Sequence, residues 1–358
     1  MGFSLDFFKN AGLAEKTLWT FVFLSIAAGL AMTSAIVFKL GKPHGTDFYY
    51  HLQYAEKYAK GEMALFDPAL MENNKGPYPP LFHLLLALPA FFGLGVQFGA
   101  FLAVFLFPVA LAATVFAVYK LKGLREAALA GVILLSGVAF FDRGGQVTPQ
   151  AVDMIFAPLA FYAFFKSKER LFVLSSAVMA YSHAPYSFLV FAPFAFYAFW
   201  KNFNKSMVLK AFVAMLPVVL LAGFFMPSYL GSASSVNNAQ EQKILSEPLW
   251  FIAYLSPPLF LAFVYALYKT RVKRSVAEDE LQQFSLLWLL CLAPLAFLFP
   301  DRLASYASQP IAIFASLALA KSFSNDKKLL AVAAVLFALA IAYSIYPFFS
   351  LLQQGLLV

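Results

Sequence analysis

The sequence is poor in charged residues and has a single cysteine. Only 12% of its 358 residues are charged, against about 25% in ordinary soluble domains, while 62% are hydrophobic and the mean hydropathy is +0.75. These values exclude a water-soluble globule and predict a polytopic membrane protein. Cys291 lies in an apolar run, so neither an intrachain disulfide nor a cysteine metal site can form.

The motifs of several enzyme classes are also missing. The sequence has no glycine-rich phosphate loop, no HExxH and no GxSxG, so nucleotide hydrolysis, zinc proteolysis and serine esterase chemistry lack support. The long hydrophobic segments carry almost no charge at their centres, which argues against an ion-coupled transporter. The net charge of +8 resides in short basic runs between hydrophobic blocks. Such runs orient a protein in a membrane, so we expect no nucleic-acid partner.

Eleven hydrophobic blocks are candidates for crossing a bilayer core of about 30 Å. They cover roughly residues 18–40, 97–119, 127–141, 149–165, 171–184, 186–200, 207–226, 248–268, 282–299, 303–320 and 329–347. The first block is too long for a signal-peptide core and lacks a small-residue cleavage site, so we expect it to be retained. A further block, Leu81–Phe92, would be only about 20 Å long as a helix and is predicted to be interfacial or re-entrant. The blocks predict one all-α membrane domain over residues 1–358 with about 11 transmembrane helices.

The distribution of basic residues leaves two topologies open. Eleven spans with a cytoplasmic N-terminus place most of the 26 basic residues in the cytoplasm and make residues 42–96 an extracytoplasmic loop. Twelve spans, with Leu81–Phe92 crossing and the N-terminus outside, satisfy the charge rule slightly better but place the start of this loop in the cytoplasm. Because Leu81–Phe92 is short, we adopt the 11-span topology, which describes a multi-pass protein of the cell membrane.

The stretch from His44 to Pro80 is the one place where acids, histidines and tyrosines gather between hydrophobic blocks. Thr46 is a favourable N-cap, and residues 47–60 are predicted to form a helix that Gly61 ends. Helical spacing places four polar or aromatic side chains on one face: Asp47, Tyr50, His51 and Tyr54. Such a face suits a sugar or a phosphate. The alternative is an amphipathic helix that lies on the bilayer with its tyrosines at headgroup level.

Three further polar sites fall on the same side of the 11-span topology. They are Asp142-Arg143 before a Gly-Gly turn, His183, and Asp301-Arg302 at the start of the tenth span. Charges at a membrane edge are usually functional, and an arginine there can bind a phosphate bidentately. Asp153 follows one turn into the fourth span, and Tyr306 and Gln309 follow Arg302 at roughly helical spacing. The alternatives are local pairing of each acid with its neighbouring arginine, and a His183 that caps a short hairpin.

The first loop resembles the GT-C superfamily of membrane glycosyltransferases, which includes protein O-mannosyltransferases, aminoarabinose transferases and catalytic subunits of oligosaccharyltransferases. The resemblance rests on an acid soon after the first span, a Tyr-His pair and the Pro-Tyr-Pro-Pro-Leu run at residues 77–81. It covers about residues 15–170, and the run DFYYHLQYAEKYAKG is most similar to archaeal members. It implies membrane-parallel helices in the first outer loop and a polyprenyl-phosphate-linked sugar as donor. By this resemblance Asp47 is the catalytic acid, Asp142 a second functional acid and Arg302 the arginine that meets the lipid phosphate.

The sequence therefore predicts a glycosyltransferase that moves a sugar from a polyprenyl-phosphate donor to an acceptor hydroxyl on the extracytoplasmic face. Asp47 is the expected catalytic residue. The expected substrate-binding residues are His51, Tyr50, Tyr54, Tyr78, Asp142, Arg143, His183 and Arg302. The second hypothesis is a lipid or lipid-linked-sugar binding or transport protein without turnover. A Mg²⁺ or Mn²⁺ ion shared by Asp47 and Asp142, with Glu241 or Glu247, and a metal-free site are equally open.

Overall fold

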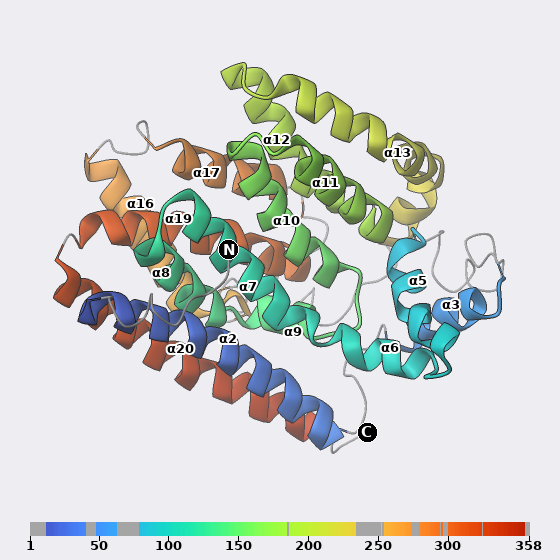
Figure 1. The fold of residues 1–358 in the computed structure, drawn as a ribbon, viewed down its shortest axis with the longest axis horizontal. Helices are drawn as coiled ribbons and strands as arrows, with labels where there is room; N and C mark the ends of the chain where they lie inside the picture. The colour runs from blue at the N-terminus through green and yellow to red at the C-terminus, as the bar shows by residue number, and fades with distance from the viewer. Residues whose placement is uncertain are drawn as a thin grey trace.

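The computed structural model describes residues 12–40, 48–62, 79–184, 186–233, 252, 254–273, 279–293, 295, 300–323 and 325–354. Every regular element within these ranges is a helix, which agrees with the predicted all-α class (Figure 1). The helices are α2 (Leu13–Leu40), α3 (Phe48–Ala59), α5 (Leu81–Ala87), the 3-10 helix η2 (Leu88–Phe92), α6 (Val96–Ala103), α7 (Leu106–Leu121), α8 (Leu124–Leu135), α9 (Val138–Gly144), α10 (Gln150–Phe165), α11 (Glu169–His183), α12 (Tyr186–Lys201), α13 (Lys205–Ala233), α16 (Pro257–Lys273), α17 (Glu280–Leu292), α19 (Pro300–Ser322) and α20 (Asp326–Gln354).

The centre of the fold is a bundle built around α19, α8, α7 and α10. Almost all side chains of α19 are buried, and this helix packs against α8, α16 and α17. The pair α2 and α20 lies along one side of the bundle, and α12 and α13 lie on another (Figure 1). A separate, smaller hydrophobic core joins α3, α5 and α6 through Phe48, Phe82 and Val96. This smaller core also includes Val152 of α10, so it joins the first-loop helices to the side of the bundle.

Helix length and composition support a membrane protein. In the part of the chain that the structure describes, residues 13–35 and 302–322 form helices long and apolar enough to cross a membrane. Two bent helix pairs raise this number to four if each pair is one span, and other apolar helices, including α10 and α17, are shorter. The count of 11 spans stays a prediction.

Two blocks that the sequence presents as continuous spans are bent in the structure. The block 97–119 is divided into α6 and α7, which meet at 41°, and the block 127–141 is divided into α8 and α9, which meet at 78°. Pro108 accounts for the first bend, because it cannot donate a hydrogen bond to the carbonyl of Val104, four residues earlier. The second bend occurs at Gly137, whose ψ of 99° is extended rather than helical. This bend turns α9 so that it ends with Asp142 and Arg143 at the edge of the bundle.

The block Leu81–Phe92 consists of the one short α-helix α5 and the single turn η2. Phe82, His83 and Leu86 are buried against the rest of the protein, whereas the leucines at 84, 85 and 88 are exposed. Gly93 and Gly95 follow with φ of +77° and +78°, a left-handed backbone that favours glycine and ends the helix. The segment is as short as the sequence analysis expected of an interfacial or re-entrant element.

Opposite ends of the bundle differ in charge. α10 runs from Gln150 to Phe165 and α11 returns to His183. The connection between them carries Lys166 and Lys168, and it lies at the opposite end from Gln150 and His183. We call the end that carries this connection the basic end. Lys122 is bound there to Asp279 at 2.9 Å, and Arg125 contacts Asp326 at 3.7 Å. The basic connections between α7 and α8, α10 and α11, α12 and α13, and α19 and α20 share this end.

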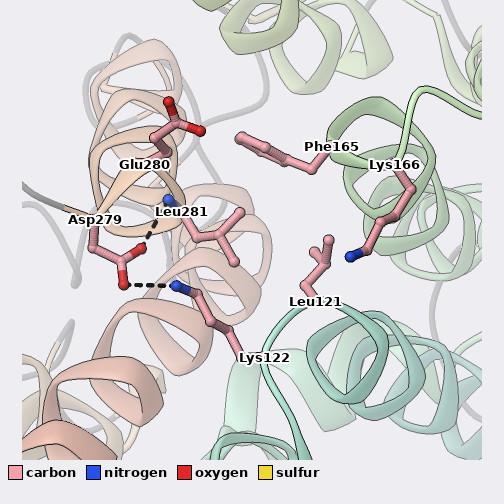
Figure 2. A pocket seen from close by; sticks show the side chains of 7 residues that line it. All are labelled: Leu121, Lys122, Phe165, Lys166, Asp279, Glu280 and Leu281. Carbon is pink, nitrogen blue, oxygen red and sulfur yellow. Dashed lines mark hydrogen bonds and ion pairs between the residues drawn. The ribbon is translucent and has the colours of Figure 1, made fainter.

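The basic end also contains a pocket of about 280 Å³ (Figure 2). It is lined by Leu121, Lys122, Phe165, Lys166, Asp279, Glu280 and Leu281. Asp279 accepts a hydrogen bond from the Leu281 amide at 3.0 Å and so caps the start of α17. Because Asp279 also binds Lys122, this carboxylate fixes α17 to the end of α7.

Candidate functional site

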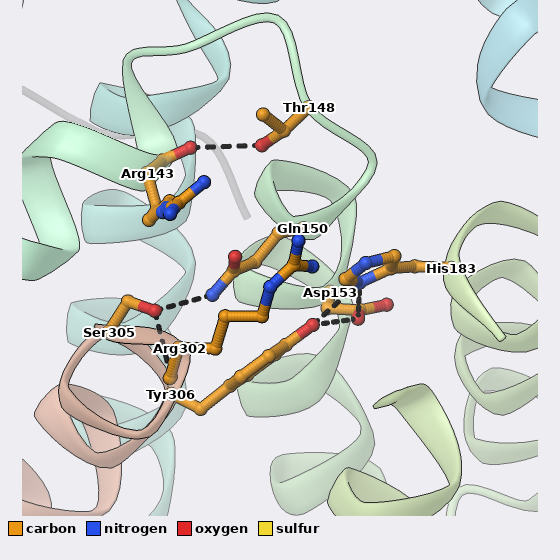
Figure 3. Close-up of polar contacts among 8 residues, drawn as sticks. All are labelled: Arg143, Thr148, Gln150, Asp153, His183, Arg302, Ser305 and Tyr306. Carbon is orange, nitrogen blue, oxygen red and sulfur yellow. Dashed lines mark hydrogen bonds and ion pairs between the residues drawn. The ribbon is translucent and has the colours of Figure 1, made fainter. Parts of the chain in front are cut away.

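Three buried polar side chains meet where α10, α11 and α19 come together. His183 Nδ1 lies 2.9 Å from Asp153 Oδ2, and the Tyr306 hydroxyl donates to the same carboxylate oxygen at 2.8 Å. The Tyr306 hydroxyl is also 2.6 Å from His183 Nδ1 (Figure 3). None of the three residues is more than 4% exposed. We call Asp153, His183 and Tyr306 the buried triad.

Local sequence explains why these side chains stand at helix ends. Pro149 precedes the first residue of α10, so Asp153 falls in the first turn, where the helix macrodipole favours a carboxylate. α11 ends at His183 because Ala184 precedes a proline and takes an extended backbone, with ψ of 147°. Tyr306 follows Arg302 by about one turn on α19. The local sequence therefore sets the three helix ends, and each end carries one residue of the triad.

Further hydrogen bonds fix the spacing of the same helices. Gln150 donates to the Ser305 hydroxyl, which in turn donates to the Arg302 carbonyl at 2.9 Å. One turn deeper, Gln309 donates to Thr114 at 2.9 Å and to the Met154 carbonyl at 2.6 Å. These buried bonds hold α19 against α10 and α7, so the triad sits in a rigid frame.

Two arginines and a histidine from the first loop lie within electrostatic reach of the triad. Arg302, Arg143 and His51 each lie within electrostatic reach of His183, and Arg302 lies within reach of His51 as well. Figure 3 shows the Arg302 guanidinium beside the His183 ring. Thr148 donates to the Arg143 carbonyl at 3.2 Å, which closes the turn after α9. The structure thus brings together four residues that the sequence analysis selected: His51, Arg143, His183 and Arg302.

His51 and His83 form a second buried contact, between α3 and α5. His51 Nδ1 and His83 Nε2 are 2.9 Å apart, and neither side chain is more than 2% exposed. Burial, followed by the Arg302 guanidinium, lowers the pKa of His51 to about 3. Burial, followed by His51, holds the pKa of His83 well below its ordinary range. Both imidazoles are neutral at physiological pH, so one ring donates the hydrogen bond and the other accepts it.

The predicted aromatic face of the first-loop helix packs against α5. Tyr54 is fully buried, with ring centroids 4.7 Å from His83 and 5.0 Å from Tyr50. This burial argues against a headgroup position for Tyr54, whereas Tyr49 on the same helix is 60% exposed. Gly61 has φ of +78° and follows the helix end as predicted. Asp47 and Tyr78 lie outside the described residues, and the binding roles of Tyr50 and Tyr54 stay predictions.

Asp142 is held by two donors at the end of α9. Its Oδ1 accepts from Gln146 at 2.8 Å and its Oδ2 from Tyr254 at 2.7 Å. A carboxylate has further lone pairs, so Asp142 fits the role of one metal ligand. Among the residues that the structure describes, no group of three or more His, Cys, Asp or Glu side chains could hold a metal ion. The other predicted ligands, Asp47 with Glu241 or Glu247, lie outside the described residues, so the metal hypothesis stays a prediction.

Sequence reasoning assigned no role to His83, Gln150, Asp153 or Tyr306. Asp153 and Tyr306 were visible as polar residues within apolar spans, and a buried polar group needs a partner. Arg302, Tyr306 and Gln309 also share one helix face by their spacing. What the sequence could not supply is the partner on another helix, since that depends on how α10, α11 and α19 pack.

Comparison with known proteins supports the fold. No protein-family model and no curated protein sequence matches the chain. The apo crystal structure of ArnT from Cupriavidus metallidurans is similar, with a TM-score of 0.56 at 14% identity over 85% of this chain and 61% of that one. The same protein bound to undecaprenyl phosphate gives a TM-score of 0.57 at 14% identity over 94% and 71%. This chain therefore spans about 61% of the length of apo ArnT.

An oligosaccharyltransferase from Archaeoglobus fulgidus, in complex with Zn and sulfate, aligns over 92% of this chain and 52% of that one at 15% identity. Its TM-score of 0.39 is too low to carry an argument. ArnT is an aminoarabinose transferase of the GT-C superfamily. The resemblance to GT-C proteins that the first loop indicates is thus confirmed at the level of the fold.

Proposed function

We propose that the chain is a membrane glycosyltransferase that moves a sugar from a polyprenyl-phosphate-linked donor to an acceptor hydroxyl. The observation that carries this proposal is the convergence of Arg143, Arg302 and the buried triad at one end of a GT-C fold. The ArnT structure of that fold binds undecaprenyl phosphate. Two guanidiniums at the end of a membrane bundle suit a phosphate that cannot leave the bilayer interface.

The chemistry of transfer explains why positive charge belongs there. When the bond between the sugar and the phosphate oxygen breaks, the electron pair stays on that oxygen. The polyprenyl phosphate then carries one more negative charge than the donor did. Groups that favour this developing charge lower the barrier. Arg302 lies at the start of α19 and Arg143 at the end of α9, and both guanidiniums are within electrostatic reach of His183.

Asp47 is the proposed general base for the acceptor hydroxyl. In sequence it directly precedes the first residue of α3 and lies four residues before His51. His51 lies within electrostatic reach of both His183 and Arg302. The helix that follows Asp47 is thereby held next to the proposed phosphate site.

Substitution of Asp47 tests this function. We expect Asp47→Asn to abolish sugar transfer and to leave binding of the polyprenyl phosphate intact, because the amide keeps the shape but cannot accept a proton. The products of purified protein with a panel of lipid-linked sugars would be read by mass spectrometry. Glu62→Gln is the matched control, since Glu62 is exposed and contacts only the surface Lys57 at 3.8 Å among the described contacts.

Full transfer by Asp47→Asn would remove Asp47 from the mechanism. A wild-type protein that binds lipid-linked sugars and never releases polyprenyl phosphate would instead identify a binding or transport protein. Full activity after exhaustive chelation would exclude the metal hypothesis and leave Asp47 as a simple base.

A further inference from the structure

The Nδ1 side of the His183 ring is occupied by protein. Asp153 Oδ2 lies 2.9 Å from Nδ1 and the Tyr306 hydroxyl lies 2.6 Å from it. Because Tyr306 also donates to Asp153 at 2.8 Å, the three groups form a closed ring of contacts. A buried imidazole held by two partners at one nitrogen has a fixed orientation. The opposite nitrogen, Nε2, therefore has a fixed direction as well.

The state of Nε2 follows from counting protons in the Asp153–His183 pair. A buried pair that carries no net charge avoids the cost of an isolated charge. In such a pair one proton lies between Oδ2 and Nδ1, and it belongs either to the carboxyl or to the ring. In both cases Nε2 carries its own hydrogen, as an imidazolium or as the neutral Nε2–H tautomer. Nε2 is then a hydrogen-bond donor whichever group holds the shared proton.

The surroundings of His183 favour an anion. Arg302 on α19 and Arg143 on α9 place two positive charges within electrostatic reach of it. His51 on α3 also lies within reach, but it is neutral and binds His83 on α5. The acids described at this end, Asp142 and Asp153, already accept hydrogen bonds. The neighbouring helices α12 and α13 have their charged residues at the other end, at Lys201, Lys205 and Lys210. An anion that binds both arginines would offset their positive charge. The Asp153–His183 pair could then stay neutral.

We propose that His183 Nε2–H is a third donor to the phosphate of a polyprenyl phosphate, beside Arg143 and Arg302, and that Asp153 and Tyr306 are the positioning residues that fix this donor. The inference rests on the proposed function, because its ligand is the lipid phosphate of that reaction. It adds one more donor, a histidine whose Nε2 always carries a hydrogen, to a phosphate site that the proposed function describes only by its arginines. It concerns binding of the phosphate and involves no covalent step.

A pair of substitutions at His183 separates this role from a purely structural one. Asparagine places an amide nitrogen near the position of Nδ1, whereas glutamine places one near the position of Nε2. If Nε2–H binds the phosphate, His183→Asn weakens binding of undecaprenyl phosphate by about tenfold or more, since a hydrogen bond to a charged group contributes about 1.5–3 kcal/mol. His183→Gln should bind within about threefold of the wild type, because it keeps a donor at Nε2. The dissociation constants would be measured on the purified full-length protein in nanodiscs.

Asp153 offers a second pair of variants that does not alter the histidine. The amide of Asp153→Asn can donate to Nδ1, which keeps the hydrogen on Nε2 and preserves phosphate binding. Asp153→Leu has a similar shape but leaves the tautomer unfixed, so it should weaken binding several-fold, and Tyr306→Phe should weaken it less. Ser285→Ala is the control, since it removes a buried hydrogen bond to the Leu281 carbonyl, at 2.8 Å within α17, that involves none of the triad residues.

The outcomes distinguish the inference from the function on which it rests. If His183→Asn binds undecaprenyl phosphate as the wild type does, or better than His183→Gln, the triad is structural and the inference is wrong. Equal binding by Asp153→Asn and Asp153→Leu also contradicts the inference. The Asp153 pair is the deciding test when a His183 variant does not fold. If the wild type itself binds no undecaprenyl phosphate, the proposed function fails first.

Discussion

Burial inside the protein is the main reason that His51 and His83 stay neutral, and this has a consequence for stability. The pKa of His51 is about 3 in the folded protein, whereas an unfolded histidine has a pKa of about 6.5. Between these values the unfolded chain binds a proton that the folded chain excludes. The free energy of unfolding is therefore fully retained above about pH 6.5 and falls as the pH drops toward 3. His83, whose pKa is also lowered, acts in the same direction.

We therefore expect the thermal midpoint of the solubilised protein to fall on going from pH 7.5 to pH 5. The fall should be smaller in the double variant His51→Gln/His83→Gln, which lacks both titrating groups. Tryptophan fluorescence during heating would measure the midpoints. An equal fall in the two proteins would mean that other groups cause the acid sensitivity.

The position of a single residue was predictable where one helix or one turn decides it. Arg302 begins a span and His183 ends one before a proline, so the sequence already places both at a membrane edge. The contact of His183 with Asp153 and Tyr306 joins residues 30 and 123 positions away. Periodicity shows which residues share the face of one helix, but it does not show which faces of different helices meet.

At the scale of helices, the sequence predicted where helices form better than it predicted whether each helix is continuous. The helix before Gly61 is present as predicted, and the helical segment at Leu81–Phe92 is as short as predicted. The bends between α6 and α7 and between α8 and α9 were missed because hydrophobicity runs through them without interruption. Pro108 and Gly137 were the available signals, since proline and glycine mark helix breaks. A hydropathy pattern alone does not report whether the chain turns inside the apolar region.

The packing of α5 on α6 leads to a prediction at this scale. A Cβ atom on Gly99 would lie 2.1 Å from the Leu86 carbonyl oxygen, and this backbone atom cannot move aside alone. Gly99→Ala must therefore push α5 away from α6, at a cost of about 1–3 kcal/mol. Since α5 carries His83, which binds His51, we expect both a lower thermal midpoint and a slower transfer rate.

Gly12→Ala is the control for this change, because a Cβ atom there meets nothing within 4 Å. Heating curves and transfer assays on the two variants would be compared with the wild type. A Gly99→Ala protein with an unchanged midpoint would show that α5 and α6 can separate at little cost.

The whole molecule has a basic end and an opposite end that carries the candidate site. The membrane class was predictable because it depends on composition. The orientation, which depends on where the lysines and arginines fall, stays a prediction. The structure adds that His51, in the first loop, lies within electrostatic reach of Arg302 and His183. The first loop and the start of α19 thus share one end. This arrangement favours the 11-span topology, because the 12-span topology places the loop and Arg302 on opposite sides of the membrane.

Sidedness determines which donors can reach the site, since nucleotide sugars are supplied in the cytoplasm and lipid-linked sugars also outside. With Cys291 changed to Ala, the 11-span topology predicts that Asn73→Cys is labelled from outside intact cells by a membrane-impermeant thiol reagent. Lys168→Cys, at an exposed position of the basic end, should be labelled only after lysis. If neither cysteine reacts before lysis, the 12-span topology holds and the first loop is cytoplasmic. If Lys168→Cys alone reacts in intact cells, the site faces the cytoplasm, and a lipid-linked donor would no longer follow from the position of Arg302.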